Sequence, residues 1–327
     1  MLLFLSPVIA ELLSSSAPPA EFFTPFGLVV LVGLYGGGSI LIRELTIRWG
    51  NGWTGRLILA LAYAILEEGV MVKTFFGFGD AANNQAYLLD NTMGVGWVWV
   101  LGINIYHVVY SILLPILMVE LMVGEEERRT AWVSDRVLRR FGWWFGLVVA
   151  LGTLGFHSPQ MVPWWPVLVV GALMVAAGWV LVARRVGRVA QVRRGVPPSP
   201  RRYFFEVLGL SLLYWFSFMG ADVIDPATPL ASSGLVSLWL VLLSLLFLWW
   251  ARERLAGREL SVAHYVAMVW GLLPFHFFMA FIAELDQNRS DNPTGMWLVG
   301  VAFLVFLVWW SRRVRRGPVR PALAGAG

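Results

Sequence analysis

Cysteine is absent from the sequence, lysine occurs once, and charged residues of both signs make up only 14% of the 327 residues. The lack of cysteine excludes disulfide bonds and thiolate metal ligands, so any metal site must use histidine and carboxylate side chains. The low charge, beside a hydrophobic content of 58%, leaves too little polar surface for a soluble domain of this length. A mean hydropathy of +0.69 agrees with a membrane protein.

Basic residues are confined almost entirely to five short segments that alternate with long apolar runs. All but Lys73 and Arg289 lie in Arg43–Arg56, Arg128–Arg140, Arg184–Arg202, Arg252–Arg258 and Arg312–Arg320. The net charge is +5, but these side chains stand beside the ends of apolar runs, where topology and anionic lipid headgroups explain them. We therefore expect the lipid bilayer and its headgroups at the cytoplasmic face as partners, and no nucleic acid. Nothing in the sequence specifies an oligomeric state.

Nine apolar runs approach the length of about 20 residues that a helix needs to cross a bilayer. They are approximately Phe26–Ile42, Leu57–Val72, Val95–Met122, Phe141–Phe156, Val162–Ala183, Tyr203–Val223, Gly234–Trp250, Val262–Ala283 and Thr294–Trp310. Nine spans place all five basic segments on one face, which the positive-inside rule makes cytoplasmic. The sequence therefore predicts an all-α, polytopic transmembrane helical bundle in the cell (plasma) membrane, multi-pass, with the N-terminus outside and the C-terminus cytoplasmic.

The pattern of charge and proline divides the chain further. Residues 1–25 are apolar at first and then proline-rich, which predicts an external segment that re-enters or lies on the membrane rather than a tenth span. Residues 26–183 form a five-span half and residues 203–311 a four-span half. The basic cytoplasmic linker 184–202, whose prolines stop a helix, joins them, and residues 312–327 form a basic cytoplasmic tail.

Ionisable residues inside the apolar runs are the candidates for chemistry, because placing one in hydrocarbon carries a large free-energy cost. Glu67 and Glu68 lie near the outer end of the second span, about 100° apart on an α-helix, so at most one carboxylate is expected to face a given partner. Lys73 follows closely and is a candidate counter-ion. The alternative is a carboxylate pair at the lipid–water boundary, with Lys73 extending to water.

The third span carries Asn104, His107 and Ser111 at spacings of three and four residues, which place them along one stripe of a helix. His107 falls near mid-membrane, where a neutral imidazole can bind a metal ion, relay a proton or cap a neighbouring backbone. The alternative is a buried hydrogen bond between helices. Glu120, at the inner end of the same span, is expected close to solvent.

Further ionisable groups lie at a similar depth in other spans. His276 and Glu284 share one face of the eighth span beside Pro274, while His157 and Asp222 end the fourth and sixth spans. We predict one polar cavity in the outer half of the bundle. Its predicted catalytic residues are Glu67, Glu68, His107 and His157, and its predicted substrate or proton pathway is Asn104, Ser111, Asp222, His276 and Glu284. No cofactor is specified, but a divalent metal ion is the candidate, with His107 and His157 as ligands.

Residues 62–161 resemble the CPBP (Abi, CAAX-processing) intramembrane endopeptidases in their Glu-Glu pair and the two histidines that follow. That family's pattern reads EExxxR, FxxxH and HxxxN, and here Val72, Ile103 and Met161 replace the Arg, Phe and Asn. The chain is also similar to uncharacterised bacterial multi-span proteins that share a Tyr-Gly-Gly-Gly…Ile-Arg-Glu-Leu segment, here Tyr35–Leu45. This second likeness assigns no activity.

The CPBP resemblance implies an intramembrane hydrolase in which Glu67 or Glu68 activates a water molecule, with His107 and His157 assisting it or binding a metal. Two alternatives remain open. A proton- or cation-coupled transporter would use the same cavity beside its proline-weakened helices. A structural membrane scaffold would use the buried polar groups only to join helices.

Overall fold

The computed structural model describes residues 1–76, 89–156, 195–221, 224–225, 227–286 and 289–317, with residues 169, 172 and 173. This part of the chain is almost entirely helical. Its one sheet is a two-stranded antiparallel hairpin, β1 (Asn91–Thr92) and β2 (Val95–Gly96), in which Asn91 lies opposite Gly96. The prediction of an all-α protein is confirmed for the described residues.

Seven helices of the described chain are long and apolar enough to cross a membrane, and each coincides with a predicted span. They are Pro25–Trp49, Trp97–Met122, Asp135–Gly155, Pro200–Gly220, Leu235–Arg254, Val262–Leu285 and Met296–Arg315. The second predicted span is also helical, as α5 (Gly52–Ala64) and η3 (Ile65–Met71), but it carries Arg56 and the Glu-Glu pair. The predicted span Val162–Ala183 lies almost entirely outside the described residues, so the count of nine stays a prediction.

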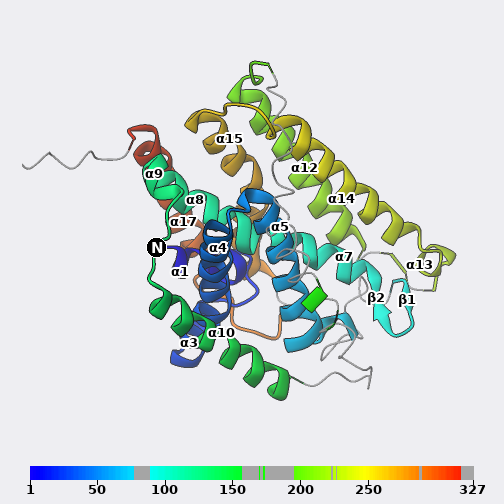
Figure 1. Ribbon diagram of the computed structural model, residues 1–327. Helices are drawn as coiled ribbons and strands as arrows, with labels where there is room; N and C mark the ends of the chain where they lie inside the picture. The colour runs from blue at the N-terminus through cyan, green and yellow to red at the C-terminus, as the bar shows by residue number, and fades with distance from the viewer. Residues whose placement is uncertain are drawn as a thin grey trace, which may run out of the picture.

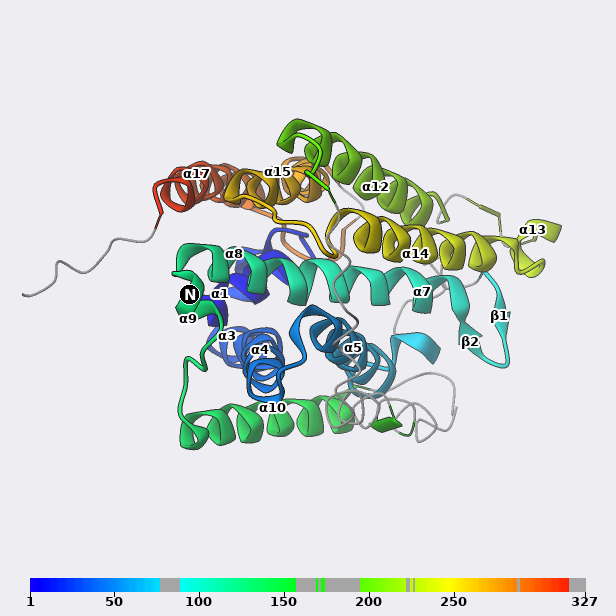
Figure 2. The same cartoon turned by 45° about the horizontal axis from the view of Figure 1, so that its top comes forward.

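One long helix runs between two groups of helices (Figures 1 and 2). It consists of α7 (Trp97–Tyr106), η6 (His107–Leu113) and α8 (Leu114–Met122). On one side lie α4 (Gly37–Trp49), α5 with η3, and α10 (Asp135–Gly155). On the other side lie α12 (Pro200–Gly220), α14 (Leu235–Arg254), α15 (Val262–Leu272), α16 (Pro274–Ile282) and α17 (Met296–Arg315). Because the central helix contacts both groups, its side chains pack into one hydrophobic core that both groups share.

Short helices complete the described chain. They are α2 (Pro19–Phe22), α3 (Pro25–Leu31), η2 (Val32–Gly36), η4 (Thr74–Phe76), α9 (Glu125–Arg128), α13 (Pro229–Ser232) and η8 (Ala283–Leu285). The loop before β1 fixes the start of α14: the Asp90 carboxylate accepts hydrogen bonds from the backbone N–H groups of Gly234 (2.8 Å) and Ser237 (3.2 Å). A carboxylate at a helix N-terminus stabilises the unpaired N–H groups of the first turn.

The N-terminal segment is an apolar helix inside the bundle, formed by α1 (Leu2–Pro7) and η1 (Val8–Leu12). It packs against η2, α4, η6 and α8. Ser6 is fully buried, with its Oγ 2.8 Å from Ser39 Oγ and 2.5 Å from the Ser111 carbonyl oxygen. A helix that is apolar on most of its faces is stabilised by burial. The prediction that residues 1–25 re-enter or lie on the membrane from outside stays a prediction.

This segment extends from one end of the bundle towards the other. Met1 lines a cavity of about 160 Å³ together with Arg43 and Trp132, while the Ser15 carbonyl accepts a hydrogen bond from Arg289 in the loop before α17. Met1 lies at the end where α17 finishes (Figure 2). The predicted orientation of the two termini relative to the membrane, and the assignment of the basic segments to the cytoplasm, stay predictions.

Candidate functional site

Four π-helical segments supply polar side chains to one buried cluster, which we call the acidic site. η1 carries Glu11, η2 carries Tyr35, η3 carries Glu67 and Glu68, and η6 carries His107. A π turn closes its hydrogen bond over one more residue than an α turn and is rare outside functional sites. Glu67 and His107 are each 2% exposed and Glu68 is 7% exposed. The acidic site is therefore enclosed by protein.

The imidazole of His107 lies between the two adjacent carboxylates. Its Nε2 is 2.7 Å from Glu68 Oε1, and its Nδ1 is 3.4 Å from Glu67 Oε2 and 3.1 Å from Ser111 Oγ. The expectation that only one carboxylate faces a given partner is wrong. The π turn changes the angular spacing of the two glutamates, and a ring with nitrogens at two positions offers each carboxylate a separate atom.

A third carboxylate reaches the acidic site from the N-terminal helix. The Tyr35 hydroxyl donates a hydrogen bond to Glu11 Oε1, and the Tyr35 ring stacks on the His107 ring with centroids 6.0 Å apart. Tyr63 lies on the other side of Tyr35, at 6.2 Å between centroids. The sequence analysis missed Glu11 and Tyr35. A lone carboxylate inside the apolar run of the first 13 residues was the signal that could have found Glu11.

The acidic site has an excess of negative charge. It holds three carboxylates and one imidazole, and no lysine or arginine of the described chain forms an ion pair with them. Lys73, expected as a counter-ion, instead directs its ammonium to the carbonyl oxygens of Thr153 and Phe156. Within the described residues, Glu67 Oε2 also accepts no hydrogen bond. Buried charges are normally neutralised by a proton, paired or bound to a metal ion, so three carboxylates beside one imidazole favour the binding of a proton or a cation.

The residues present fit a divalent metal ion. One ligand atom each from Glu67, Glu68 and His107 lie within 4.8 Å of one another. Ligands around one zinc-sized ion lie about 2.0–2.2 Å from it, and therefore within about 4.4 Å of one another, so the three atoms lie near the spacing of a shared centre. Two carboxylates and an imidazole suit manganese, iron or zinc better than monovalent copper, which prefers sulfur. His157, the second ligand predicted from the sequence, lies outside the described residues.

The other predicted site residues are distributed over several places. Asn104 donates from Nδ2 to the Val100 carbonyl oxygen at 2.6 Å, one turn before His107. His276 is buried on α16, across the central helix from the acidic site. Glu284 accepts a hydrogen bond from the Gly295 backbone N–H and thereby caps α17. Asp222 lies outside the described residues. Of the predicted cavity, the structure brings together Glu67, Glu68, His107 and Ser111.

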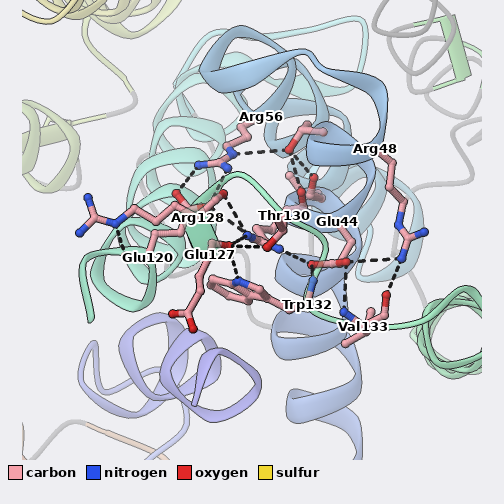
Figure 3. A network of polar contacts seen from close by, with 12 residues as sticks. Glu44, Arg48, Arg56, Glu120, Glu127, Arg128, Thr130, Trp132 and Val133 are labelled. Carbon is pink, nitrogen blue, oxygen red and sulfur yellow. Dashed lines mark hydrogen bonds and ion pairs between the residues drawn. The ribbon is translucent and has the colours of Figure 1, made fainter. Parts of the chain in front are cut away.

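A second ionic cluster lies on the same helices, nearer the Met1 end of the bundle (Figure 3). We call Arg43, Glu44, Arg56 and Glu120 the paired cluster. The two guanidine nitrogens of Arg56 lie 2.7 and 2.6 Å from the two oxygens of Glu120, and Arg43 Nε lies 3.3 Å from Glu120 Oε1. Arg43 also donates to Glu44. Its guanidinium stacks 3.5 Å from the Trp132 ring.

The position of Glu120 corrects the sequence analysis. Glu120 was expected near solvent, but it is only 6% exposed, because Arg56 from α5 and Arg43 from α4 both reach it inside the bundle. The loop that follows α8 closes over this cluster: Arg128 Nε donates to the Glu120 carbonyl oxygen at 2.6 Å, and the Trp132 backbone N–H donates to Glu44. The paired cluster thus joins α4, α5, α8 and this loop.

Comparison with known proteins gives one match. The model of a family described as an uncharacterized membrane protein family matches residues 1–316. No curated protein and no solved structure matches the chain. The match covers both ionic clusters and all seven of the apolar helices, so a multi-pass membrane protein is established, whereas the likeness to the CPBP endopeptidases stays an expectation.

Proposed function

The chain belongs to this uncharacterised family of membrane proteins, and we propose that it is a metal-dependent hydrolase acting within the membrane. The observation that carries the proposal is the convergence of Glu67, Glu68 and His107 to within 4.8 Å in a buried site. Carboxylates without a basic partner are costly in such a place unless they bind a proton or a metal ion.

Three residues would hold the ion, and two would support them. Glu67, Glu68 and His107 are the ligands, and three protein ligands leave a coordination position open, which is typical of catalytic rather than structural metal sites. A divalent ion at such a position supplies an activated water molecule and polarises a substrate carbonyl. Tyr35 orients Glu11 beside the ligands, where a third carboxylate adds to the attraction for a cation.

Two observations favour hydrolysis as the chemistry. The Glu-Glu pair and the following histidine occupy the positions that match the CPBP endopeptidase pattern, and three of the four side chains that this likeness implicates, Glu67, Glu68 and His107, meet at the acidic site. The Tyr63 hydroxyl also has no partner among the described residues although it is buried next to Tyr35. A free phenol O–H beside carboxylates is a donor for a substrate oxygen.

The test is the metal content of the purified protein in detergent, compared between variants. We expect about one manganese, iron or zinc ion per chain, lost in His107→Ala and Glu68→Gln. His264→Ala is the matched control, because His264 is also buried but pairs with Ser261 and the Pro198 carbonyl oxygen away from this site. Metal retained in His107→Ala, or absent from the wild type, would overturn the metal site. A metal-loaded wild type then enters a screen for cleavage of membrane-spanning peptides.

A transporter coupled to protons or cations is the second candidate. It is favoured by the departures from regular α-helix geometry: η6 lies within one long helix and η3 ends another at the acidic site, and transporters build their binding sites on irregular helical segments. In proteoliposomes, a coupled transporter would show cation uptake that Glu68→Gln abolishes, without any product of cleavage. A hydrolase would show the reverse pattern.

The location and orientation of the protein are part of the same proposal. We place it in the plasma membrane with the basic segments, including Arg252–Arg258 and Arg312–Arg320, at the cytoplasmic face beside anionic lipid headgroups. Single cysteines near Ser16 and near Arg316 test this placement in a chain that has no native cysteine. A membrane-impermeant thiol reagent added outside should modify the first and spare the second.

A further inference from the structure

A second polar position lies across the central helix from the acidic site. The eighth predicted span is irregular at one residue: α15 ends at Leu272, and α16 begins at Pro274. His276 stands on the first turn of α16 and is 1% exposed. An ionisable side chain buried within a membrane helix is a candidate for function.

The polar atoms at this position lack partners within the described chain. Neither Nδ1 nor Nε2 of His276 forms a hydrogen bond, and neither does Nε1 of Trp215, a buried residue on α12. The two rings meet edge to face with centroids 5.4 Å apart. A buried donor or acceptor without a partner costs about 1–3 kcal/mol, and here three such atoms share one place.

Aromatic rings surround these atoms, and we call the group the His276 box. The Tyr110 ring lies 4.6 Å from His276, the Tyr106 ring stacks on it at 6.0 Å, and Phe275 stacks on Trp215 at 4.3 Å. The hydroxyls of both tyrosines are already committed, that of Tyr106 to the Ala10 carbonyl oxygen and that of Tyr110 to Ser211. The walls therefore provide no partner for the imidazole.

The chemistry of the unpartnered atoms specifies their ligand. A neutral imidazole has one donor and one acceptor, and the indole N–H is a donor, so the complement is an oxygen that both donates and accepts hydrogen bonds. A hydroxyl oxygen meets this requirement, whereas a carboxylate or an ammonium group does not. Ring centroids 4.3–6.0 Å apart are contact distances, so the rings pack closely around these atoms. Water is the smallest group that both donates and accepts hydrogen bonds.

We propose that the His276 box binds ordered water inside the membrane-spanning bundle, held by His276 and Trp215. Internal water of this kind pairs with buried polar groups that would otherwise be unsatisfied. The box adjoins the acidic site through one side chain, since the Tyr106 ring contacts His107 edge-on at 5.2 Å and stacks on His276. The use of this water in hydrolysis rests on the proposed function, but its binding does not.

Hydroxyl-radical labelling in nanodiscs tests the proposal, because radiolysis of water modifies buried aromatic side chains only where water is in contact with them. We expect Trp215 to be oxidised several-fold faster than Trp310. Trp310 is the matched control: it is also buried, but its Nε1 donates to the Met118 carbonyl oxygen at 2.9 Å. His276→Phe should reduce labelling of Tyr106 and Tyr110, and His264→Phe should leave it unchanged.

The comparison of Trp215 with Trp310 is made in the wild-type protein, so it remains valid if His276→Phe fails to fold, and His276→Asn then serves as the milder variant. Equal, low labelling of the two tryptophans would overturn the proposal, as would an organic molecule extracted from the wild type and lost in His276→Asn. Metal content at the acidic site is independent of this result. If Trp215 is not labelled but metal is bound at the acidic site, only the water site is contradicted. If Trp215 is labelled but no metal is bound, only the proposed hydrolase is contradicted.

Discussion

The paired cluster and the acidic site share three long helices, to which the acidic site adds the N-terminal helix with Glu11, and they differ in charge balance. The paired cluster sets two guanidinium groups against two carboxylates, and both oxygens of Glu120 accept from arginine. The acidic site sets three carboxylates against one imidazole. Both clusters are buried, so burial of ionisable groups alone does not distinguish structure from function.

The two clusters also differ in the backbone conformation of the segments that carry them. The paired cluster stands on regular α-helix, in α4, α5 and α8, whereas the acidic site stands on π turns in all of its elements. Regular helices with satisfied ion pairs need no further ligand. Irregular turns, an unpartnered Glu67 oxygen and excess negative charge are features that a fold retains at the expense of stability, and they are typical of sites where a ligand binds.

The largest difference in stability is expected when one carboxylate is neutralised in each cluster. Glu120→Gln leaves two buried guanidinium groups with one carboxylate and should lower the free energy of unfolding by about 3–5 kcal/mol. Glu68→Gln removes one of several mutually repelling carboxylates and should change it by less than about 1 kcal/mol. Unfolding in detergent micelles, followed by circular dichroism, measures both.

Glu206→Gln is the control for this comparison, since Glu206 pairs with Arg202 and Arg254 in a partly exposed position. This variant should lower the free energy of unfolding by less than Glu120→Gln does. Equal losses at Glu120 and Glu68 would mean that the acidic site is also a structural ion pair, and the contrast between the two clusters would fail.

A smaller effect should follow from adding metal. A ligand that binds only the folded state stabilises it by about 2.7 kcal/mol at a hundredfold excess over its dissociation constant. We expect manganese or zinc to raise the free energy of unfolding of the wild type by this amount. A chelator should reverse the increase, and Glu68→Gln should abolish it. Glu120→Gln, although less stable, should retain the full increase. A metal response that survives Glu68→Gln would locate the ion elsewhere.

The smallest effect concerns an ion pair outside the membrane helices. The hydrogen bond from Arg289 lowers the pKa of the Asp291 carboxyl below its usual value. A group with a lowered pKa stabilises the folded state above its unfolded pKa, near 3.9, and loses that contribution as the pH falls through its folded pKa. Asp291→Asn should therefore cost less than about 1 kcal/mol at neutral pH.

Thermal unfolding of the wild type and Asp291→Asn between neutral and acid pH measures this difference, which should vanish in acid. Arg289 keeps its hydrogen bond to the Ser15 carbonyl oxygen in both proteins. A difference in stability between the two proteins that stays constant down to acid pH would show that the charge of Asp291 contributes nothing to the ion pair.

Much of the helical architecture could be predicted because length and hydropathy determine it. Each of the seven apolar helices coincides with a predicted span, since about 20 apolar residues have few alternatives to crossing a bilayer. The packing position of the N-terminal helix could not be predicted, because its 11 residues are too few to span and carry no basic residue to orient them. Its position follows from packing against Ser39 and Ser111, which no local pattern in the first 25 residues encodes.

The candidate site was predicted in part. Glu67, Glu68 and His107 were identifiable because ionisable residues within apolar runs are rare. Their mutual contact was not, because the π turns that bring both carboxylates to one ring have no sequence signature. Glu120 was misjudged for a related reason: its partner Arg56 lies on another helix, 64 residues away in the sequence.

The buried N-terminal helix also sets the order in which the protein can assemble. Residues 2–13 are made before the helices that surround them, and the Ser111 carbonyl oxygen that Ser6 contacts lies 105 residues further along the chain. The helix can therefore dock only after the spans up to α8 that form its binding groove have been made. Glu11 arrives with it, so the third carboxylate joins Glu67 and Glu68 only when this docking takes place.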